Sequence, residues 1–310
     1  MKLVYHPACL EHRVDDFCPE KPERLRALVE EVLDLDPQKK IWPLEELRRR
    51  KRTIHAGERF LDLFHSSAYI KEVKEFCRDL RTGEAHQFEN QDLWLSPESY
   101  RAACYAVSAT VLAAELARNA RSAFAIVRPP GHHAHRDYGD GFCIFNNIAI
   151  ATEYLLRRGE KVLIVDIDLH LGDGTLDYIE GKKDAFYFSI NQRGLWPYSD
   201  PGNFRNTNNI FLEENTEDSE YCRVLEQELV PTIDSFDPTI IAVSAGFDTL
   251  STDYEIGQTL FGGGFNLTQR SVEKLRSILE RASIPYFATL EGGYDSISVI
   301  NGVTALANLK

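Results

Sequence analysis

The chain has 310 residues, of which 43% are hydrophobic and 27% charged, so it can bury a large core and is not a disordered chain. The 35 Lys and Arg residues against 48 Asp and Glu residues give a formal net charge of −13, which disfavours unaided binding to nucleic acid. No apolar run approaches the roughly 20 residues of a membrane span, and residues 1–7 lack the apolar segment of a secretory signal.

Short buried strands alternate with amphipathic helices along most of the chain. The apolar runs that are rich in Val, Ile and Phe predict strands over 122–127, 161–165, 185–190, 239–244 and 285–290. The stretches between and after them predict helices over 97–120, 146–158, 219–236, 268–282 and 296–309. Ser96 is expected to cap the first helix, and Gly159 to end the second.

This alternation predicts an α/β fold in which a mostly parallel central sheet carries helices on both faces. The first 90 or so residues are expected to be mostly helical and to cover the same domain, because no linker separates them from the rest. We therefore expect one domain over residues 1–310. The arginine-rich run at 48–52 is interpreted as a solvated helix end.

Titratable residues and glycines follow four of the predicted strands, at 128–135, 166–174, 245–248 and 291–294. Ligand sites of open α/β sheets lie outside the carboxyl ends of their strands, so these four segments are expected to meet in one site.

The run Asp166-x-Asp168-x-His170 indicates a metal site. Residues at this spacing share one side of an extended chain, and Asp248 from another strand could supply a third ligand. Oxygen and nitrogen ligands with an open position for water suit Zn²⁺, Fe²⁺, Mn²⁺ or Co²⁺ in a catalytic site. The alternative is that Asp168 and His170 only cap the following helix.

Two adjacent histidines, His132 and His133, could act as general base and acid, with Asp166 and Asp173 fixing their tautomers. Their alternative is a pair of solvent-facing loop histidines, and we interpret His135 as non-catalytic.

A Gly-Gly turn precedes Tyr294, whose hydroxyl could donate to a developing oxyanion. The alternative is a plain turn followed by a packed tyrosine. Together the motifs indicate metal-assisted hydrolysis of a carbonyl compound, an amide in particular.

The motifs closely resemble those of the zinc-dependent histone deacetylase superfamily, which includes acetylpolyamine amidohydrolases and shares the three-layer arginase-type fold. The resemblance runs from His6 to about Tyr294. Besides the runs above, it rests on the stretches at 19–25, 65–70, 129–134 and 141–147.

This resemblance implies that Asp168, His170 and Asp248 bind the metal, Zn²⁺ or alternatively Fe²⁺ or another divalent ion. It also implies monovalent-cation sites made of backbone oxygens around the same run, with a structural K⁺ near Ser189. Arg24 resembles the arginine that lines the acetate-release channel of the family.

The resemblance further implies that His133, paired with Asp173, is the general base and then the general acid. His132, paired with Asp166, would be its electrostatic partner. Tyr294 would polarise the scissile carbonyl opposite the metal.

For the substrate, the resemblance places Gly141, Phe142 and Trp196 at the walls of an acyl-lysine tunnel. Asp92 falls near a rim position that binds substrate backbone or amine, and Glu255 falls near a glutamate that reads a distant ammonium in polyamine-selective members. The alternatives without a role in substrate binding are core packing for Trp196 and solvated surface charge for Asp92 and Glu255.

The chain departs from the family pattern at three places. Leu171 replaces the second histidine of the Asp-x-His-His run, and Asn191 stands where a histidine is common. The segment between Asp248 and Leu267 is longer than usual. We expect the metal site to survive the change at Leu171, because that position is not a ligand, while local hydrogen bonding must differ.

The sequence therefore predicts a metal-dependent amidohydrolase acting on acetyl-lysine, an acetylpolyamine or another small acylated amine. Its alternative is a deacetylase-like binding protein with little or no turnover. An arginase-like ureohydrolase is disfavoured, because Gly246 and Leu250, and no further carboxylate, flank Asp248 at two residues. Six cysteines without a CxxC pair indicate free thiols and a cytoplasmic location. The acidic net charge and the lack of a long apolar run predict that neither nucleic acid nor a membrane is a partner. The sequence carries no signal for an oligomeric state.

Overall fold

The computed structural model describes residues 1–33, 42–43, 57–90, 92–120, 122–198, 202, 206–253 and 263–309. The predictions made for the run at 48–52 and for Glu255 lie outside these residues. Among the described helices, none is long and apolar enough to cross a membrane.

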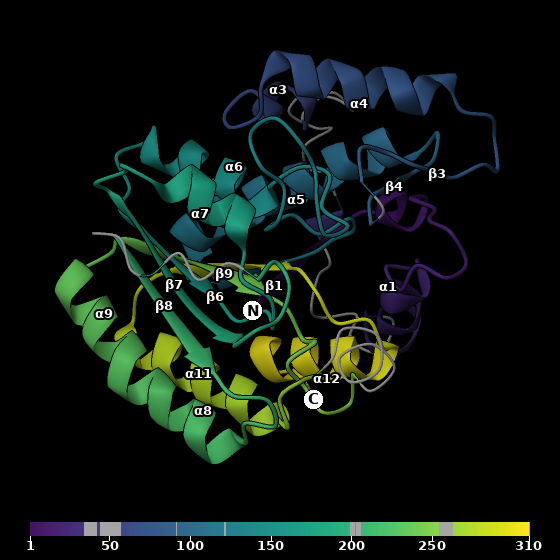
Figure 1. Ribbon diagram of the computed structural model, residues 1–310. Coiled ribbons are helices and arrows are strands. Elements are labelled where there is room, and N and C mark those ends of the chain that lie inside the picture. The colour runs from purple at the N-terminus through teal and green to yellow at the C-terminus, as the bar shows by residue number, and fades with distance from the viewer. Residues whose placement is uncertain are drawn as a thin grey trace.

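A parallel sheet of eight strands forms the centre of the molecule, in the order β2-β1-β5-β10-β9-β6-β7-β8 (Figure 1). Its strands are β1 (Lys2–Tyr5), β2 (Trp42–Pro43), β5 (Ser122–Ile126), β6 (Val162–Asp166), β7 (Ala185–Gln192), β8 (Thr207–Leu212), β9 (Ile240–Ala245) and β10 (Tyr286–Leu290). A separate antiparallel pair joins β3 (His86–Gln87) and β4 (Trp94–Leu95). The predicted α/β fold class with a mostly parallel sheet is confirmed.

Helices cover both faces of the sheet (Figure 1). One face carries α5 (Ser99–Ala120), α6 (Asn147–Leu156) and α7 (Asp173–Ile179), and the other carries α8 (Asp218–Val224), α9 (Val230–Phe236), α11 (Gln269–Ala282) and α12 (Ser296–Ala307). The remaining helical segments are α1 (Glu23–Ala27), α3 (Glu58–Leu61), α4 (Ser67–Asp79), a 3₁₀ turn at Pro7–Leu10 and π-helical segments at Leu28–Leu33 and Leu225–Leu229.

Several predicted boundaries need correction. Helix α5 begins at Ser99 rather than at residue 97, and a turn in which the Ser99 N–H donates to the Ser96 carbonyl oxygen at 3.0 Å precedes it. The single helix predicted over 219–236 is interrupted by the π-helical segment between α8 and α9. The expectation for the N-terminal region missed β1, which is a full strand of the central sheet.

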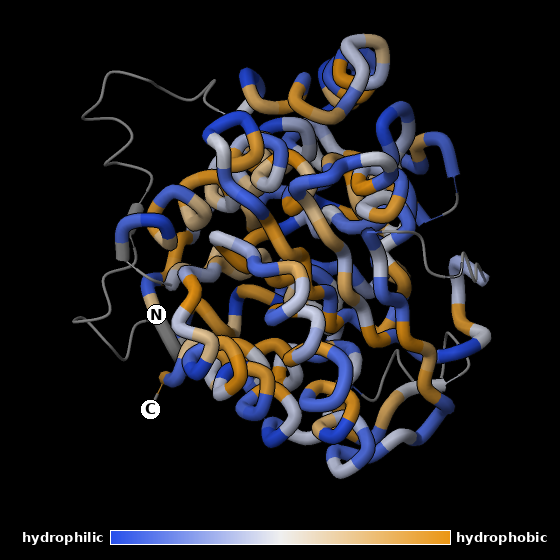
Figure 2. The backbone as a smooth tube through the Cα atoms, turned by 90° about the vertical axis from the view of Figure 1, so that its left-hand side faces the viewer, coloured by the Kyte–Doolittle hydropathy of each residue, from blue (hydrophilic) through white to orange (hydrophobic). Residues whose placement is uncertain are grey.

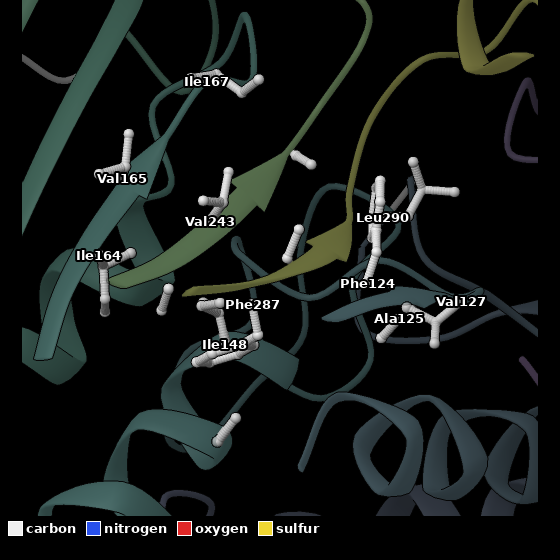
Figure 3. Close-up of a cluster of buried hydrophobic side chains, with 14 of the residues drawn as sticks. Phe124, Ala125, Val127, Ile148, Ile164, Val165, Ile167, Val243, Phe287 and Leu290 are labelled. Atoms are coloured by element: carbon white, nitrogen blue, oxygen red, sulfur yellow. The ribbon is translucent and has the colours of Figure 1, made fainter. Parts of the chain in front are cut away.

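The core lies between the sheet and its helices, as Figure 3 shows for Phe124 of β5, Ile164 of β6, Val243 of β9 and Phe287 of β10. Ile148 of α6 packs beneath them (Figure 3). Hydrophobic segments run through the middle of the molecule, while the peripheral turns are largely hydrophilic (Figure 2). Each fully buried side chain of this size contributes about 1.5–3 kcal/mol to folding.

The strand order explains how the site is assembled. Strands β5, β10, β9 and β6 are consecutive neighbours, and all four run in the same direction. Their carboxyl ends therefore lie side by side, and the loops that follow them meet at one edge of the sheet, as the sequence predicted.

Candidate active site

Three predicted metal ligands come together at this edge. Asp168 and His170 lie in the loop after β6, and Asp248 lies in the loop after the adjacent β9. Their ligand atoms are within 4.8 Å of one another, and all three side chains are buried. His170 Nδ1 is 3.0 Å from Asp248 Oδ2 and 3.3 Å from Asp168 Oδ1.

The local backbone differs from the extended run that the sequence suggested. Strand β6 ends at Asp166, and the next residues form a bend in which Asp166 Oδ1 accepts from the Asp168 N–H and Asp168 Oδ1 accepts from the His170 N–H. Side-chain to backbone hydrogen bonds of this kind favour a turn over a strand. As a result the carboxylate of Asp166 faces His132, outside the three-residue cluster.

Glycines make room for the cluster. A Cβ atom at Gly246 or at Gly292 would collide with Asp168 Oδ2, and the Gly292 N–H donates to that same oxygen at 2.8 Å. Glycines at these positions leave the space beside Asp168 free of side chains. Two carboxylates and one imidazole this close together match the ligand set of a catalytic divalent cation.

The electrostatics of the cluster fit a cation as well. Burial lowers the pKa of His170, but its hydrogen bonds with Asp168 and Asp248 outweigh burial and raise the pKa to about 9. Burial also raises the pKa of Asp248 above its ordinary value. The raised pKa keeps a proton on His170 at neutral pH, and a divalent ion bound by the three groups would displace that proton.

The two histidines of the loop after β5 each face a carboxylate. His132 Nδ1 lies 3.1 Å from Asp166 Oδ2, and His133 Nδ1 lies 2.8 Å from Asp173 Oδ1. Each Nδ1 is therefore oriented by a carboxylate, which leaves Nε2 of each ring for the site. His135 contacts the other oxygen of Asp173 at 3.4 Å.

These two histidines have opposite proton affinities. Burial and the charge of His132 lower the pKa of His133 to about 4, so its ring is a neutral proton acceptor at neutral pH. Burial also disfavours charge on His132, but the carboxylates of Asp168 and Asp166 outweigh it and hold the pKa of His132 well above its usual range. Neighbouring groups with pKa values pushed apart are typical of acid–base sites.

Tyr294 follows β10 in a turn that is held from two sides. Asp253 Oδ1 accepts the Tyr294 N–H at 2.7 Å, and the buried guanidinium of Arg24 donates to the carbonyl oxygens of Glu291 and Gly293. The guanidinium also lies 4.7 Å from the centre of the Tyr294 ring. Burial raises the pKa of Tyr294 well above its usual value, so the phenol keeps its proton and is a hydrogen-bond donor.

A cavity of about 190 Å³ opens onto this machinery. Its lining residues are Asp92, His133, Gly141, Phe142, His170, Trp196, Tyr198 and Tyr294. The Trp196 ring is 4.5 Å from the His133 ring, and the Phe142 ring is 5.6 Å from that of Tyr294, so aromatic faces form its walls.

Gly141 has a structural reason to be glycine. Its φ is +49°, and a Cβ atom there would lie 2.6 Å from both the His133 ring and the Trp196 ring. The structure thus brings Gly141, Phe142, Trp196 and Asp92 to one cavity. The remaining predicted substrate residue, Glu255, lies outside the described residues.

Sequence reasoning missed three contributors to the site. Tyr198 lines the cavity, Asp253 holds the turn of Tyr294, and Glu291 Oε2 accepts the N–H groups of Gly131 and His132. Glu291 stood in a recognised motif, but its side-chain role depends on a contact 160 residues away in the chain. Asp253 carries no pattern that marks it.

A buried ion pair ties the N-terminal region to the histidine loop. Arg128, directly after β5, is fully buried and donates to both carboxylate oxygens of Glu20 at 2.8 and 2.6 Å. Arg24 Nη1 also reaches Glu20 at 2.8 Å. Glu20 therefore joins the segment before α1 to the two arginines beneath the site.

The chain departs from its expected pattern at Leu171 without disturbing the cluster. Leu171 is buried and belongs to the main hydrophobic core. The position thus adds apolar contact beneath the loop that carries Asp168 and His170.

Comparison with known proteins gives consistent matches. The family model "Histone deacetylase domain" matches residues 18–309. "Histone deacetylase 5" of Arabidopsis thaliana is 28% identical over 321 residues, covering 96% of this chain and 47% of its own length. A "Probable deacetylase" of Archaeoglobus fulgidus is 28% identical over 327 residues, covering 99% of this chain and 84% of its own.

"Polyamine deacetylase HDAC10" of Homo sapiens is 30% identical over 325 residues, covering 97% of this chain and 46% of its own length. The chain spans about half the length, or less, of several of these curated relatives. A solved structure, "Crystal Structure of HDA15 HD domain", has a TM-score of 0.83 at 24% identity and covers 99% of this chain and 90% of its own. That likeness shows a shared fold.

Proposed function

The chain belongs to the histone deacetylase family, and from this premise we propose that it is a metal-dependent amidohydrolase that removes the acyl group from an acylated amine. The observation that carries the proposal is one cavity lined by His133, His170 and Tyr294 beside the Asp168–His170–Asp248 cluster. A proton acceptor, a ligand set and a neutral hydrogen-bond donor around one small space are the components that amide hydrolysis requires.

Asp168, His170 and Asp248 would hold a divalent cation, Zn²⁺ in our proposal, whose chemistry when bound is to polarise a carbonyl and to acidify water. The neutral ring of His133 takes the proton of the attacking water, with Asp173 keeping its Nδ1 protonated. His133 then returns that proton to the departing amine.

Tyr294 donates its phenolic proton in a hydrogen bond to the carbonyl oxygen as negative charge develops there. Donors placed in advance at such an oxygen contribute about 3–4 kcal/mol to transition-state stabilisation. His132, which holds its proton more firmly than His133, supplies positive charge beside the same reacting centre. The aromatic walls of Phe142 and Trp196 exclude water from the acyl chain.

We propose that the substrate is an amine with an acetyl or related acyl group, either acetyl-lysine or an acetylpolyamine. Relatives named as histone deacetylases and as polyamine deacetylases both match the chain, so family membership supports either type. Asp92 is exposed at the cavity and would attract a cationic amine.

We also propose that residues 1–310 act as one catalytic domain. The support is the sheet order, in which β1 from the beginning of the chain pairs with β5, and β5 pairs with the late strand β10. The six cysteines are unpaired, which supports our expectation of a reducing, cytoplasmic environment.

The test is amine release by the Zn²⁺-loaded protein from acetylated lysine peptides, acetylputrescine, acetylcadaverine and acetylspermidine, with Tyr294→Phe as the control. We expect turnover that Tyr294→Phe reduces at least about 100-fold. Preference within the panel assigns the substrate type. No turnover with metal bound would contradict the proposal and favour the alternative, a binding protein with this fold.

A further inference from the structure

In the loop that carries the metal ligands, each backbone carbonyl oxygen from residue 168 to residue 172 accepts a hydrogen bond from the protein. Asn191 Nδ2 donates to the carbonyl oxygens of Asp168 at 3.1 Å and His170 at 3.0 Å. The carbonyl oxygen of Leu169 accepts from the Gln192 N–H at 3.1 Å. The next two carbonyl oxygens, of residues 171 and 172, accept from the N–H groups of residues 173 and 176.

The side-chain oxygens around this loop are occupied as well. Ser189 Oγ donates to Asn191 Oδ1 at 2.7 Å. Asp166 Oδ1 accepts a backbone N–H two residues on, and Asp166 Oδ2 contacts His132 Nδ1 and accepts from the Tyr187 hydroxyl. Asn191 Nδ2 therefore points at the carbonyl oxygens of Asp168 and His170 while its Oδ1 faces Ser189 Oγ, so the amide lies among the oxygens near Ser189 that the resemblance assigned to a structural K⁺.

A second cluster of carbonyl oxygens, separate from the first and next to the start of β7, also faces a side-chain amide. Between α7 and β7, Asn206 Nδ2 donates to the carbonyl oxygens of Ile179 at 2.7 Å, Lys182 at 3.1 Å and Ala185 at 3.4 Å. The C-terminal carbonyls of a helix lack intrahelical partners and carry partial negative charge, so they attract cations or donors. Here the two amide hydrogens of Asn206 are shared among three carbonyl oxygens, of which that of Ile179 belongs to the end of α7.

We infer that the side-chain amides of Asn191 and Asn206 take the place of monovalent cations in this chain, so that its folded state needs no K⁺. An amide NH₂ directs two partially positive hydrogens at the oxygens, as a cation would, but it is covalently attached and does not dissociate. Folding then gains nothing from added K⁺, because a ligand stabilises a protein only when a site for it exists in the folded state.

The first measurement is thermal unfolding of the wild-type protein in KCl and in choline chloride at equal ionic strength. We expect the two unfolding temperatures to agree within about 1 °C, since no site for K⁺ contributes. A saturable rise of about 4 °C or more that is specific to K⁺ would overturn the inference. This readout does not depend on the proposed amidohydrolase activity.

The second measurement uses Asn191→Asp and Asn206→Asp, which keep the shape of each side chain and replace the donating NH₂ by an oxygen. Each variant removes the side-chain donor from its cluster and adds an oxygen to it. We expect a lower unfolding temperature in choline chloride and its recovery by about 4 °C or more in KCl. Recovery should be largest in the double variant, because the two clusters are separate.

Asn119→Asp is the matched control, because Asn119 Nδ2 donates to a single exposed carbonyl, that of Glu115, at 2.9 Å. It should show neither the loss nor the response to K⁺. If Asn191→Asp does not fold, Asn191→Ala provides the same test without an added charge. Variants that lose stability but respond equally to KCl and choline chloride would contradict the inference.

Discussion

At the scale of single residues, the basicity of His133 is set by opposing influences. Burial and the charge of His132 lower its pKa, whereas the hydrogen bond to Asp173 raises it, and the balance is a pKa of about 4. Because the neutral ring is the proton acceptor, activity should fall as the pH drops through this pKa and should persist above it.

The first prediction concerns that hydrogen bond. Asp173→Asn removes the influence that raises the pKa of His133, so kcat/KM should fall about 10–100-fold and the acid limb of the pH profile should move to lower pH. The measurement is kcat/KM from pH 3.5 to 8.

Asp177→Asn is the control, because Asp177 approaches His135 at 3.4 Å. That variant should retain the wild-type profile. An Asp173→Asn profile identical to the wild type would contradict the assignment of His133 as the base.

The second prediction concerns Asp253, whose Oδ1 accepts the N–H groups of Tyr294 at 2.7 Å and Asp295 at 2.5 Å. Asp253→Ala removes this support, so the phenol should lose its position and kcat should fall about 10–100-fold with KM nearly unchanged. Asp253→Asn keeps an acceptor oxygen and should recover most of the loss.

A double variant separates this positioning role from a loss of stability. In a Tyr294→Phe background Asp253→Ala should have little further effect on kcat, because the two residues act as one unit. Asp295→Ala is the control: Asp295 Oδ1 caps α12 through the Ile297 N–H at 2.8 Å, so it should lower stability and spare kcat. Additive losses in the double variant would refute the role of Asp253.

At the scale of secondary-structure elements, Glu20 joins the segment before α1 to the loop after β5. Burial would raise the pKa of Glu20, but the charges of Arg128 and Arg24 outweigh it and hold the pKa below its ordinary value. Because folding lowers the pKa of Glu20, its carboxylate stabilises the folded protein at pH values above the ordinary pKa of glutamate. This stabilisation is lost as the pH falls through the lower pKa of the folded state.

The third prediction follows from this pair. Glu20→Gln leaves two buried arginines without their carboxylate, so the free energy of unfolding should fall by about 3–5 kcal/mol. Its stability should also depend less on pH below the ordinary pKa of glutamate. Both are measured by urea unfolding between pH 3.5 and 7.

Glu23→Gln is the matched control, since Glu23 is exposed and makes only a long contact with Arg26, 3.9 Å between Oε1 and Nε. It should change stability by less than about 1 kcal/mol. Equal effects of the two variants would contradict the importance of the buried pair.

The strands also show which parts of the fold can be predicted from the sequence. The interior strands β5, β6, β7, β9 and β10 were predictable, because continuous Val, Ile and Phe runs are typical of parallel strands buried on both faces. Strand β8 was missed, since this edge strand is only partly buried and begins Thr207-Asn208-Asn209. Strand β1 was missed because four residues carry too little pattern.

Some residues of the candidate active site could likewise be predicted from the sequence, and others could not. Asp168, His170 and Asp248 could be proposed from sequence, because each follows a recognisable strand and adjacent strand ends meet. The roles of Asp253 and Asn191 could not, since both depend on hydrogen bonds to backbone atoms of other loops. Such contacts leave no periodicity or motif in the chain.

At the scale of the whole molecule, the fourth prediction concerns metal removal. Chelation leaves Asp168, His170 and Asp248 buried without a cation, so the unfolding temperature should fall by about 5 °C or more. Restoring Zn²⁺ should reverse the fall. The measurement is thermal unfolding together with the metal content of each sample.

Asp248→Ala is the comparison variant, because it removes one ligand and should make the unfolding temperature independent of chelator. A metal-free wild-type sample that unfolds at the same temperature as the metal-loaded one would contradict the assignment of the cluster.

The position of β10 in the sheet determines at which point of its synthesis the protein can become catalytically active. Strand β10 lies between β5 and β9, yet among the described strands of this sheet it is synthesised after all the others. Until it inserts, β5 and β9 expose unpaired backbone groups along two sheet edges, and such edges invite aggregation. The nascent chain should therefore depend on chaperones until β10 has emerged and inserted, and catalysis should begin only when Tyr294 follows β10 into place.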